Sequence, residues 1–249
     1  MFPIRDHNPS QRTPFVTWTL MAANIVIFLA YYPAMMGNPQ ELAFFWQDWA
    51  LIPARVADGR DWHTLFTSMF LHGGWMHLIG NMLFLYIFGD NMEDAFGHLG
   101  FLLFYLVSGL AADAVQIAAA PASQVPVVGA SGAIAGVLGG YLLLYPRARV
   151  DIVVIIVFIF RTFSLRAWIV LSIWLALQFF GGLGSNPDEG GVAYWAHAGG
   201  FVAGFVLALP FWLRQGGTAF WRRTEGSPPH PPTNTPARMS PIPTVRRRR

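Results

Sequence analysis

Residues 129–136 read GASGAIAG and lead, after Val137, into the apolar run LGGYLLLYP at 138–146. A serine therefore stands among glycines at the start of a hydrophobic segment. In a membrane helix a lone serine usually hydrogen-bonds its own backbone, and glycines four residues apart usually serve helix packing. Whether Ser131 is structural or reactive depends on which other side chains the fold brings to the same place.

The composition predicts that this segment lies in a membrane. Of the 249 residues, 54% are hydrophobic and only 12% are charged, whereas a soluble domain carries about 25% charged residues. Such a shortage of charge does not suit a water-exposed surface and indicates a polytopic membrane protein. The chain has no cysteine, which excludes disulfides, thiolate catalysis, iron–sulfur clusters and thiolate zinc sites.

Six hydrophobic segments approach the ~20 residues that a bilayer requires. They are 17–36, 75–92, 98–119, 130–146, 167–184 and 192–213. The sequence therefore predicts an all-α membrane protein with a bundle of six transmembrane helices. A seventh apolar run, 152–160, is too short to span and is expected to be an interfacial connector. The aromatic stretch 41–75 is expected to form short helices in a long first loop at the outer surface.

The placement of arginine predicts the orientation, because positive charge collects on the cytoplasmic side. Arginines cluster in 147–166 and after 213, whereas the connection between the last two segments carries only acidic charge. With six spans, both termini are expected in the cytoplasm; Arg55 and Arg60 in the first loop run against the rule. Because these charges sit in loops and ends, they do not indicate nucleic-acid binding.

The same pattern divides the chain into three parts. Residues 1–14 form a cytoplasmic N-terminal segment, 15–213 the membrane domain, and 214–249 a basic, Pro-rich tail that is expected to be disordered. The terminal RRRR could contact anionic lipid head groups or remain solvated, and the sequence leaves both open.

Polar side chains occur near the beginning of three of the apolar segments. HGGWMHLIGN at 72–81 supplies His77 and Asn81, GASG supplies Ser131, and AHAGG at 196–200 supplies His197. These three segments are the even-numbered ones, so all of them enter the membrane from the outer side. The four residues are therefore expected at one depth just below the outer surface, where polar groups are costly and usually functional.

Small residues repeat every fourth position on two of these segments, a spacing that lets membrane helices approach backbone to backbone. They are Gly132, Gly136 and Gly140 on one segment and Ala196, Gly200 and Gly204 on the other. Ser131 and His197 each adjoin the first member of a ridge. Close approach would bring the hydroxyl within hydrogen-bonding reach of the imidazole, which is the geometry of a nucleophile and its base.

Taken together, HGGWMHLIGN, GASGAIAG and AHAGGFVAG resemble the rhomboid intramembrane serine proteases, in the order of that family and across residues 15–213. The resemblance implies that Ser131 is the nucleophile and His197 the general base of a dyad. It also implies an oxyanion hole formed by His77, Asn81 and the backbone N–H of Ser131. Transmembrane protein substrates, no cofactor, no metal and a bacterial inner membrane location follow as expectations.

Two positions depart from the family pattern. Many relatives have Trp-Arg where this chain has Trp62-His63, so the loop-anchoring role of the arginine is in question. Many relatives also have a tyrosine, one turn after the serine, that stacks on the base. Here that position is Ala135, and another residue must hold the His197 ring.

Other ionisable residues near these segments are expected to be structural. His63 and His72 should bind water or backbone, and Asp113 should face the outer interface. The residues alone leave three other interpretations: a non-catalytic module that binds membrane helices, a transporter or channel, and a metal site built from His72, His77 and His197. The metal site lacks an HExxH motif and a nearby acidic ligand. Neither the substrate nor the oligomeric state is encoded in these patterns.

Overall fold

The computed structural model describes residues 2–8, 10–156, 159–186 and 189–228. Within them the chain is mostly helical, and four helices are long and apolar enough to cross a membrane. They are α1 (Phe15–Met35), α5 (Trp75–Ala119), α7 (Ala167–Gly184) and α8 (Tyr194–Arg214), while the apolar α6 (Ser131–Leu144) is shorter. The bounds of α1, α6, α7 and α8 lie within two residues of the expected segments, because continuous hydrophobicity is a local signal.

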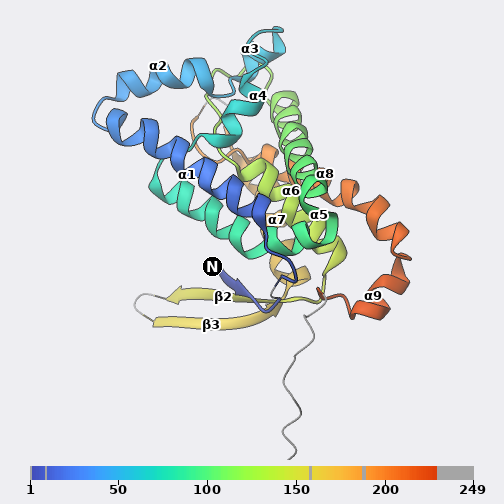
Figure 1. Ribbon diagram of the computed structural model, residues 1–249. Helices are drawn as coiled ribbons and strands as arrows, with labels where there is room; N and C mark the ends of the chain where they lie inside the picture. The colour runs from blue at the N-terminus through green and yellow to red at the C-terminus, as the bar shows by residue number, and fades with distance from the viewer. Residues whose placement is uncertain (1, 9, 157–158, 187–188, 229–249) are drawn as a thin grey trace, which may run out of the picture.

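Helix α5 contains a corner at Gly97. Its φ of 71° and ψ of 167° are not helical, so the residues on either side form two separate helical pieces. A positive φ is accessible to glycine without steric penalty, which explains why the chain can turn at this residue. The expected segments 75–92 and 98–119 fall on the two sides of this corner, and Figure 1 shows the second piece turning away from the first.

Helix α6 lies in the middle of the bundle, packed against α5 and α8. Val137, Leu138 and Tyr141 have no exposed surface. Helix α7 is the opposite case, since Leu177 is 62% exposed and Phe180 is 69% exposed. An apolar helix with such an exposed surface suits contact with lipid, whereas α6 is hydrophobic on all sides because protein surrounds it.

A three-stranded antiparallel sheet, which the all-α expectation missed, lies at one end of the molecule. Strand β1 (Phe2–Asp6) pairs with β2 (Arg149–Ile156), which pairs with β3 (Ile159–Arg166). The run that forms β2 and β3 is rich in valine and isoleucine, which favour strands, and is too short to span as a helix. The expected interfacial position of 152–160 stays a prediction, and residues 157–158 of that run lie outside the described part.

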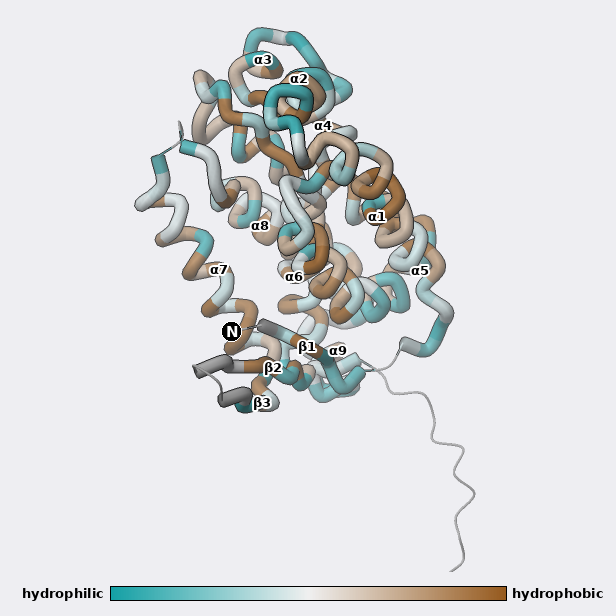
Figure 2. The backbone as a smooth tube through the Cα atoms, turned by 90° about the vertical axis from the view of Figure 1, so that its left-hand side faces the viewer, coloured by the Kyte–Doolittle hydropathy of each residue, from teal (hydrophilic) through white to brown (hydrophobic). Residues whose placement is uncertain are grey.

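The opposite end of the molecule carries the segment between α1 and α5 (Figures 1 and 2). The short helices expected there are present: α2 (Pro39–Trp49), α3 (Pro53–Ala57), α4 (Thr64–Thr67) and the 3-10 helix η1 (Ser68–Phe70). Their position at a membrane surface stays a prediction.

The segment after α8 is not entirely without structure, contrary to expectation. Helix α9 (Thr218–Thr224) follows α8 near the sheet end of the molecule, with Phe220 buried and Trp221 donating a hydrogen bond to the Leu143 carbonyl at 2.8 Å. Phe220 and Trp221 therefore attach α9 to the rest of the fold, although composition alone assigns these residues to a disordered tail. Residues 229–249 of that tail lie outside the described part.

The N-terminal segment is tied to the bundle by polar contacts as well as by β1. Asn8 donates to the Tyr141 hydroxyl at 2.9 Å, and that hydroxyl donates to Asp6 at 3.1 Å. The Glu93 carboxylate accepts from the backbone N–H of Val16 and of Thr17 at 2.9 and 2.8 Å. Glu93 thereby satisfies two of the N–H groups that the first turn of α1 leaves without intrahelical partners.

Candidate active site

Ser131 is the first residue of α6 and follows a loop that is attached to the segment between α1 and α5. Leu51 pairs with Val127, and the Gly129 N–H donates to the Ser68 carbonyl at 2.9 Å. Helix α6 has no side-chain N-cap. Its first N–H groups, including that of Ser131, are therefore free of intrahelical and capping bonds at the positive end of the helix dipole.

Gly129 lies where His77 and Ser131 meet. A Cβ on this residue would be 2.8 Å from both Cε1 and Nε2 of His77 and 3.4 Å from the Ser131 hydroxyl oxygen. Its φ of +130° is also one that side chains rarely adopt. The structure thus brings the imidazole of His77 and the hydroxyl of Ser131 to the same small space, which stays open because residue 129 is glycine.

The hydrogen bonding of His77 determines which ring nitrogen carries the proton. Its Nδ1 faces the N–H of Gly73 at 3.4 Å and accepts from it. A neutral imidazole that accepts at Nδ1 carries its proton on Nε2. Nε2 is the atom beside Gly129, so His77 presents a hydrogen-bond donor toward Ser131.

Asn81 lies one turn after His77 on α5 and is only 8% exposed. Its amide nitrogen Nδ2 has no hydrogen-bond partner among the described residues. A buried donor without a partner costs about 1–3 kcal/mol. Such a cost in a native fold indicates a donor kept for a ligand or for water.

The neighbouring His72 is fully buried, and its ring lies edge-on to that of His77 with centroids 5.2 Å apart. Burial, which penalises the charged imidazolium, lowers the pKa of His72 to about 3. His72 is therefore neutral at physiological pH. His63 Nε2 lies 2.8 Å from the Asp48 carbonyl, so this histidine contacts backbone as expected. Neither ring nitrogen of His72 has a hydrogen-bond partner among the described residues, which differs from the backbone contact expected for it.

The ridges of α6 and α8 make the expected close approach. A Cβ on Gly200 would be 2.1 Å from the Gly132 carbonyl oxygen, and one on Gly204 would be 2.0 Å from that of Gly136. Ser131 and His197 adjoin this contact, while direct hydrogen bonding between their side chains stays a prediction.

The third member of the α6 ridge, Gly140, contacts both neighbouring helices, since a Cβ there would lie 3.6 Å from the Cβ of Ala208 on α8 and 2.5 Å from Cε of Met92 on α5. The neighbouring Gly139 makes the closer approach to α8, because a Cβ there would lie 2.0 Å from the Phe201 carbonyl oxygen. Asp113, expected at the outer interface, is 7% exposed.

His197 is held by two residues of α7. Its Nδ1 lies 2.8 Å from Oε1 of Gln178, and its ring centroid lies 5.8 Å from that of Trp174 at an interplanar angle of 33°. The support that Ala135 cannot supply thus comes from a different helix. Gln178 was missed in the sequence, although a glutamine inside the apolar run AWIVLSIWLALQFF is itself a signal.

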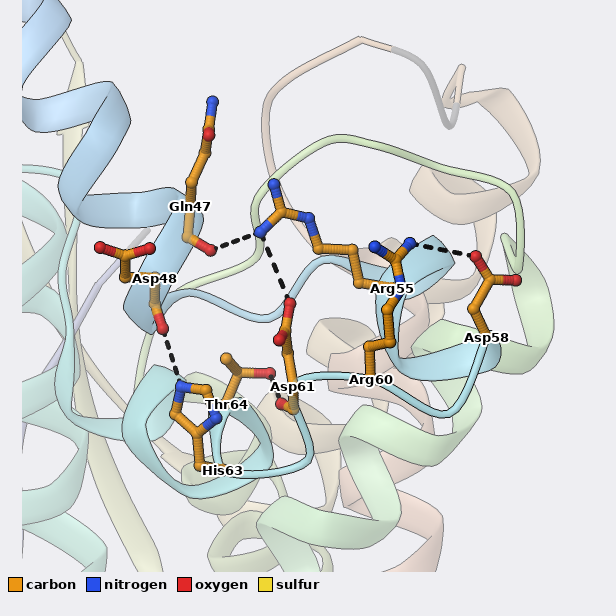
Figure 3. A network of polar contacts seen from close by, with 8 residues as sticks. All are labelled: Gln47, Asp48, Arg55, Asp58, Arg60, Asp61, His63 and Thr64. Atoms are coloured by element: carbon orange, nitrogen blue, oxygen red, sulfur yellow. Dashed lines mark hydrogen bonds and ion pairs between the residues drawn. The ribbon is translucent and has the colours of Figure 1, made fainter.

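The segment between α1 and α5 is anchored although the arginine that the family resemblance leads one to expect at position 63 is a histidine here. Figure 3 shows His63 reaching the Asp48 carbonyl of α2, while the Arg55 guanidinium donates to the Gln47 carbonyl at 2.7 Å and contacts the Asp61 carboxylate at 3.5 Å. Arg55 therefore supplies a guanidinium from a different position, and His63 supplies a second tie to α2.

The fold and the site together define the class. This is an integral membrane protein in which the first turns of α5, α6 and α8 carry polar side chains at one end of an apolar bundle. Within the described residues, no group of three or more His, Cys, Asp or Glu side chains is arranged to hold a metal ion.

The chain belongs to the rhomboid family: the family model described as Rhomboid domain matches residues 59–214. It is 34% identical over 178 residues to RHOMBOID-like protein 4 of Arabidopsis thaliana, covering 71% of this chain and 41% of that relative. It is 34% identical over 211 residues to Rhomboid protease GluP of Bacillus subtilis (strain 168), covering 84% and 37%. The chain thus spans less than half the length of these two relatives.

Proposed function

We propose that this chain is a serine endopeptidase that cleaves transmembrane segments of membrane proteins inside the bilayer. Ser131 is the nucleophile, His197 the general base, and His77, Asn81 and the Ser131 N–H form the oxyanion hole. The observation that carries the proposal is the convergence of the Ser131 hydroxyl and His77 Nε2 on the space beside Gly129. Relatives named as rhomboid proteases support the reaction class.

The reaction follows from the roles of these groups. His197 takes the proton of the Ser131 hydroxyl as the oxygen attacks the scissile carbonyl, and an acyl-enzyme forms when the imidazolium protonates the leaving amine. Water activated by His197 then releases the new carboxylate. No carboxylate contacts His197 among the contacts described for it, and Gln178 is neutral, so the imidazolium is stabilised less than in a Ser-His-Asp triad. We expect modest turnover for this reason.

The oxyanion formed during attack would meet three donors. The Ser131 N–H belongs to the first turn of α6, Nε2 of His77 carries a proton toward the serine, and the Asn81 amide has a donor without a partner among the described residues. Losing one such donor typically costs on the order of 10²–10³ in rate.

We propose six membrane crossings, with the two pieces of α5 counted separately and α6 included. Arginines such as Arg149, Arg166 and Arg222 lie at the sheet end, which supports a cytoplasmic location for that end and for both termini. The catalytic groups would then lie beneath the outer surface of a bacterial inner membrane, in a cavity that admits water. Relatives from Bacillus subtilis fit this location, while others carry chloroplastic and mitochondrial names.

A helical substrate must unwind before its peptide bond is accessible, because a helix shields its own backbone. We therefore expect substrates with glycine or proline near the cleaved bond.

The test is covalent labelling of the purified, full chain by a fluorophosphonate, together with cleavage of a glycine-containing transmembrane segment in detergent. Ser131→Ala should abolish both, and Asn81→Ala should slow cleavage by on the order of 10²–10³. Ser172→Ala, at an exposed serine of α7, is the matched control and should label like the native chain. Labelling that persists in Ser131→Ala would refute the nucleophile; a native chain that neither labels nor cleaves would refute the protease.

A further inference from the structure

Helix α7 buries few of its side chains, and one of those is polar. Its buried residues are Ala167, Leu171, Gln178 and Gly182. A glutamine amide is costly to bury unless both its oxygen and its nitrogen are hydrogen-bonded. In Gln178 the oxygen Oε1 meets His197, and the nitrogen Nε2 donates to the Trp174 carbonyl at 3.4 Å.

These two bonds define the protonation of His197. A carbonyl oxygen can only accept, so the bond to Trp174 assigns Nε2 of Gln178 as the donor and leaves Oε1 to face the histidine. Oε1 is also only an acceptor, which requires Nδ1 of His197 to carry the proton. In a neutral ring the free electron pair is then on Nε2 of His197, the nitrogen that remains available to accept the proton of a serine.

Trp174 supplies a second contact from the same face of α7. It lies four residues before Gln178, a spacing that places both side chains on one side of the helix. Its ring faces His197 at 5.8 Å and Phe201 at 6.0 Å. Gly182, a further turn along, packs on the Trp195 ring, where a Cβ would lie 3.0 Å away. This face of α7 is therefore the one that docks on α8.

We propose that Gln178 is the positioning residue of His197 and that it makes the base depend on the docking of α7 against α8. The inference rests on the proposed function. An oriented partner at Nδ1 holds the tautomer and the ring plane, as the acid does in a serine protease triad. Here the partner is neutral and sits on a helix whose other face is exposed, so displacement of α7 would remove the acceptor and the ring contact together.

Two substitutions at this position separate an orienting role from a packing role. Gln178→Leu keeps a similar volume but has no acceptor, and kcat should fall about 10- to 100-fold with little change in KM, by analogy with the partners that orient ligating histidines. Gln178→Glu keeps an acceptor and adds a charge. It should retain activity, and the acidic limb of its pH–rate profile should move to higher pH because the carboxylate favours the imidazolium.

The experiment measures kcat, KM and the pH–rate profile of the full chain in detergent on a fluorogenic peptide derived from a glycine-containing transmembrane segment. Thermal unfolding and fluorophosphonate labelling are recorded for every variant. Leu177→Ala, at the neighbouring but exposed position, should behave like the native chain. If Gln178→Leu proves unfolded, the shift of the acidic limb in Gln178→Glu still supports the proposal.

An unchanged kcat in a folded Gln178→Leu variant, or an unmoved acidic limb in Gln178→Glu, would overturn the positioning role while Ser131 still labels. A native chain that does not label at all would instead refute the proposed protease, and this inference with it.

Discussion

Replacing Gly129 by alanine tests the geometry of the site more directly than removing any of its polar groups. The new Cβ would lie 2.8 Å from Cε1 and Nε2 of His77, whereas carbon atoms prefer a separation of about 3.5–4.0 Å. The imidazole must therefore move by about 1 Å, or the loop must do so. A misplacement of about 1 Å can cost on the order of 10² in rate, and we expect a loss of that size in kcat.

The same substitution also strains the backbone. Gly129 has a φ of +130°, and a side chain in a sparsely populated backbone region costs about 1–3 kcal/mol. The melting temperature of Gly129→Ala should therefore fall, but fluorophosphonate labelling should fall much further than the folded fraction. Gly184→Ala is the matched control, because a Cβ there meets nothing within 4 Å.

The readout is the cleavage rate per folded molecule, measured on the same transmembrane peptide for both glycine variants. If Gly129→Ala cleaves at the native rate, the space beside residue 129 is not the site where His77 and Ser131 act together. If Gly184→Ala lowers the cleavage rate as much as Gly129→Ala does, the effect is a general one of added side chains, and the reasoning is refuted as well.

Three further predictions concern the fold. Gly204→Ala places a Cβ 2.0 Å from the Gly136 carbonyl oxygen and therefore pushes α6 and α8 apart. In a denaturant titration this should lower the free energy of unfolding by about 1–3 kcal/mol. The control Gly184→Ala should leave it unchanged. Glu93→Ala removes the acceptor of two N–H groups at the start of α1 and should cost about 1–3 kcal/mol in the same titration; unchanged stability would mean that solvent satisfies those groups. Burial raises the pKa of Asp6 above its ordinary 3.8, so the folded state holds this proton more tightly than the unfolded chain does. The free energy of unfolding should therefore decline as pH rises from 3.8 through the raised pKa, and Asp6→Asn should remove that part of the slope; an identical slope in both proteins would contradict it.

The contacts of His197 also bear on how the proposed Ser131–His197 dyad would work without a carboxylate partner. Gln178 can orient the imidazole through Nδ1, but as a neutral group it cannot offset the charge that the ring gains. A buried carboxylate inside a bilayer would carry a large desolvation cost, which a glutamine avoids. We therefore expect a site that is stable in lipid but has less catalytic power than one with a carboxylate partner.

Several features of this protein were determined by the sequence itself. The apolar segments were located within a few residues, because membrane insertion depends on continuous hydrophobicity, which is a local property. The small-residue ridges predicted the contact of α6 with α8 through Gly132, Gly200 and Gly204, since a four-residue spacing defines a helix face without knowledge of the neighbour. HGGWMHLIGN and GASG likewise indicated that His77 and Ser131 belong to one site.

Only the tertiary structure decided which faces meet. The rotation of one helix against the next determines that Gly139, outside the four-residue ridge, comes closest to the α8 backbone and that Asp113 is buried. The strand β1 joins a hairpin more than 140 residues away, which no local pattern encodes. Gln178 became a partner of His197 for the same reason: a side chain on α7 acquires its role only when α7 docks on α8, and that docking is a property of two surfaces together.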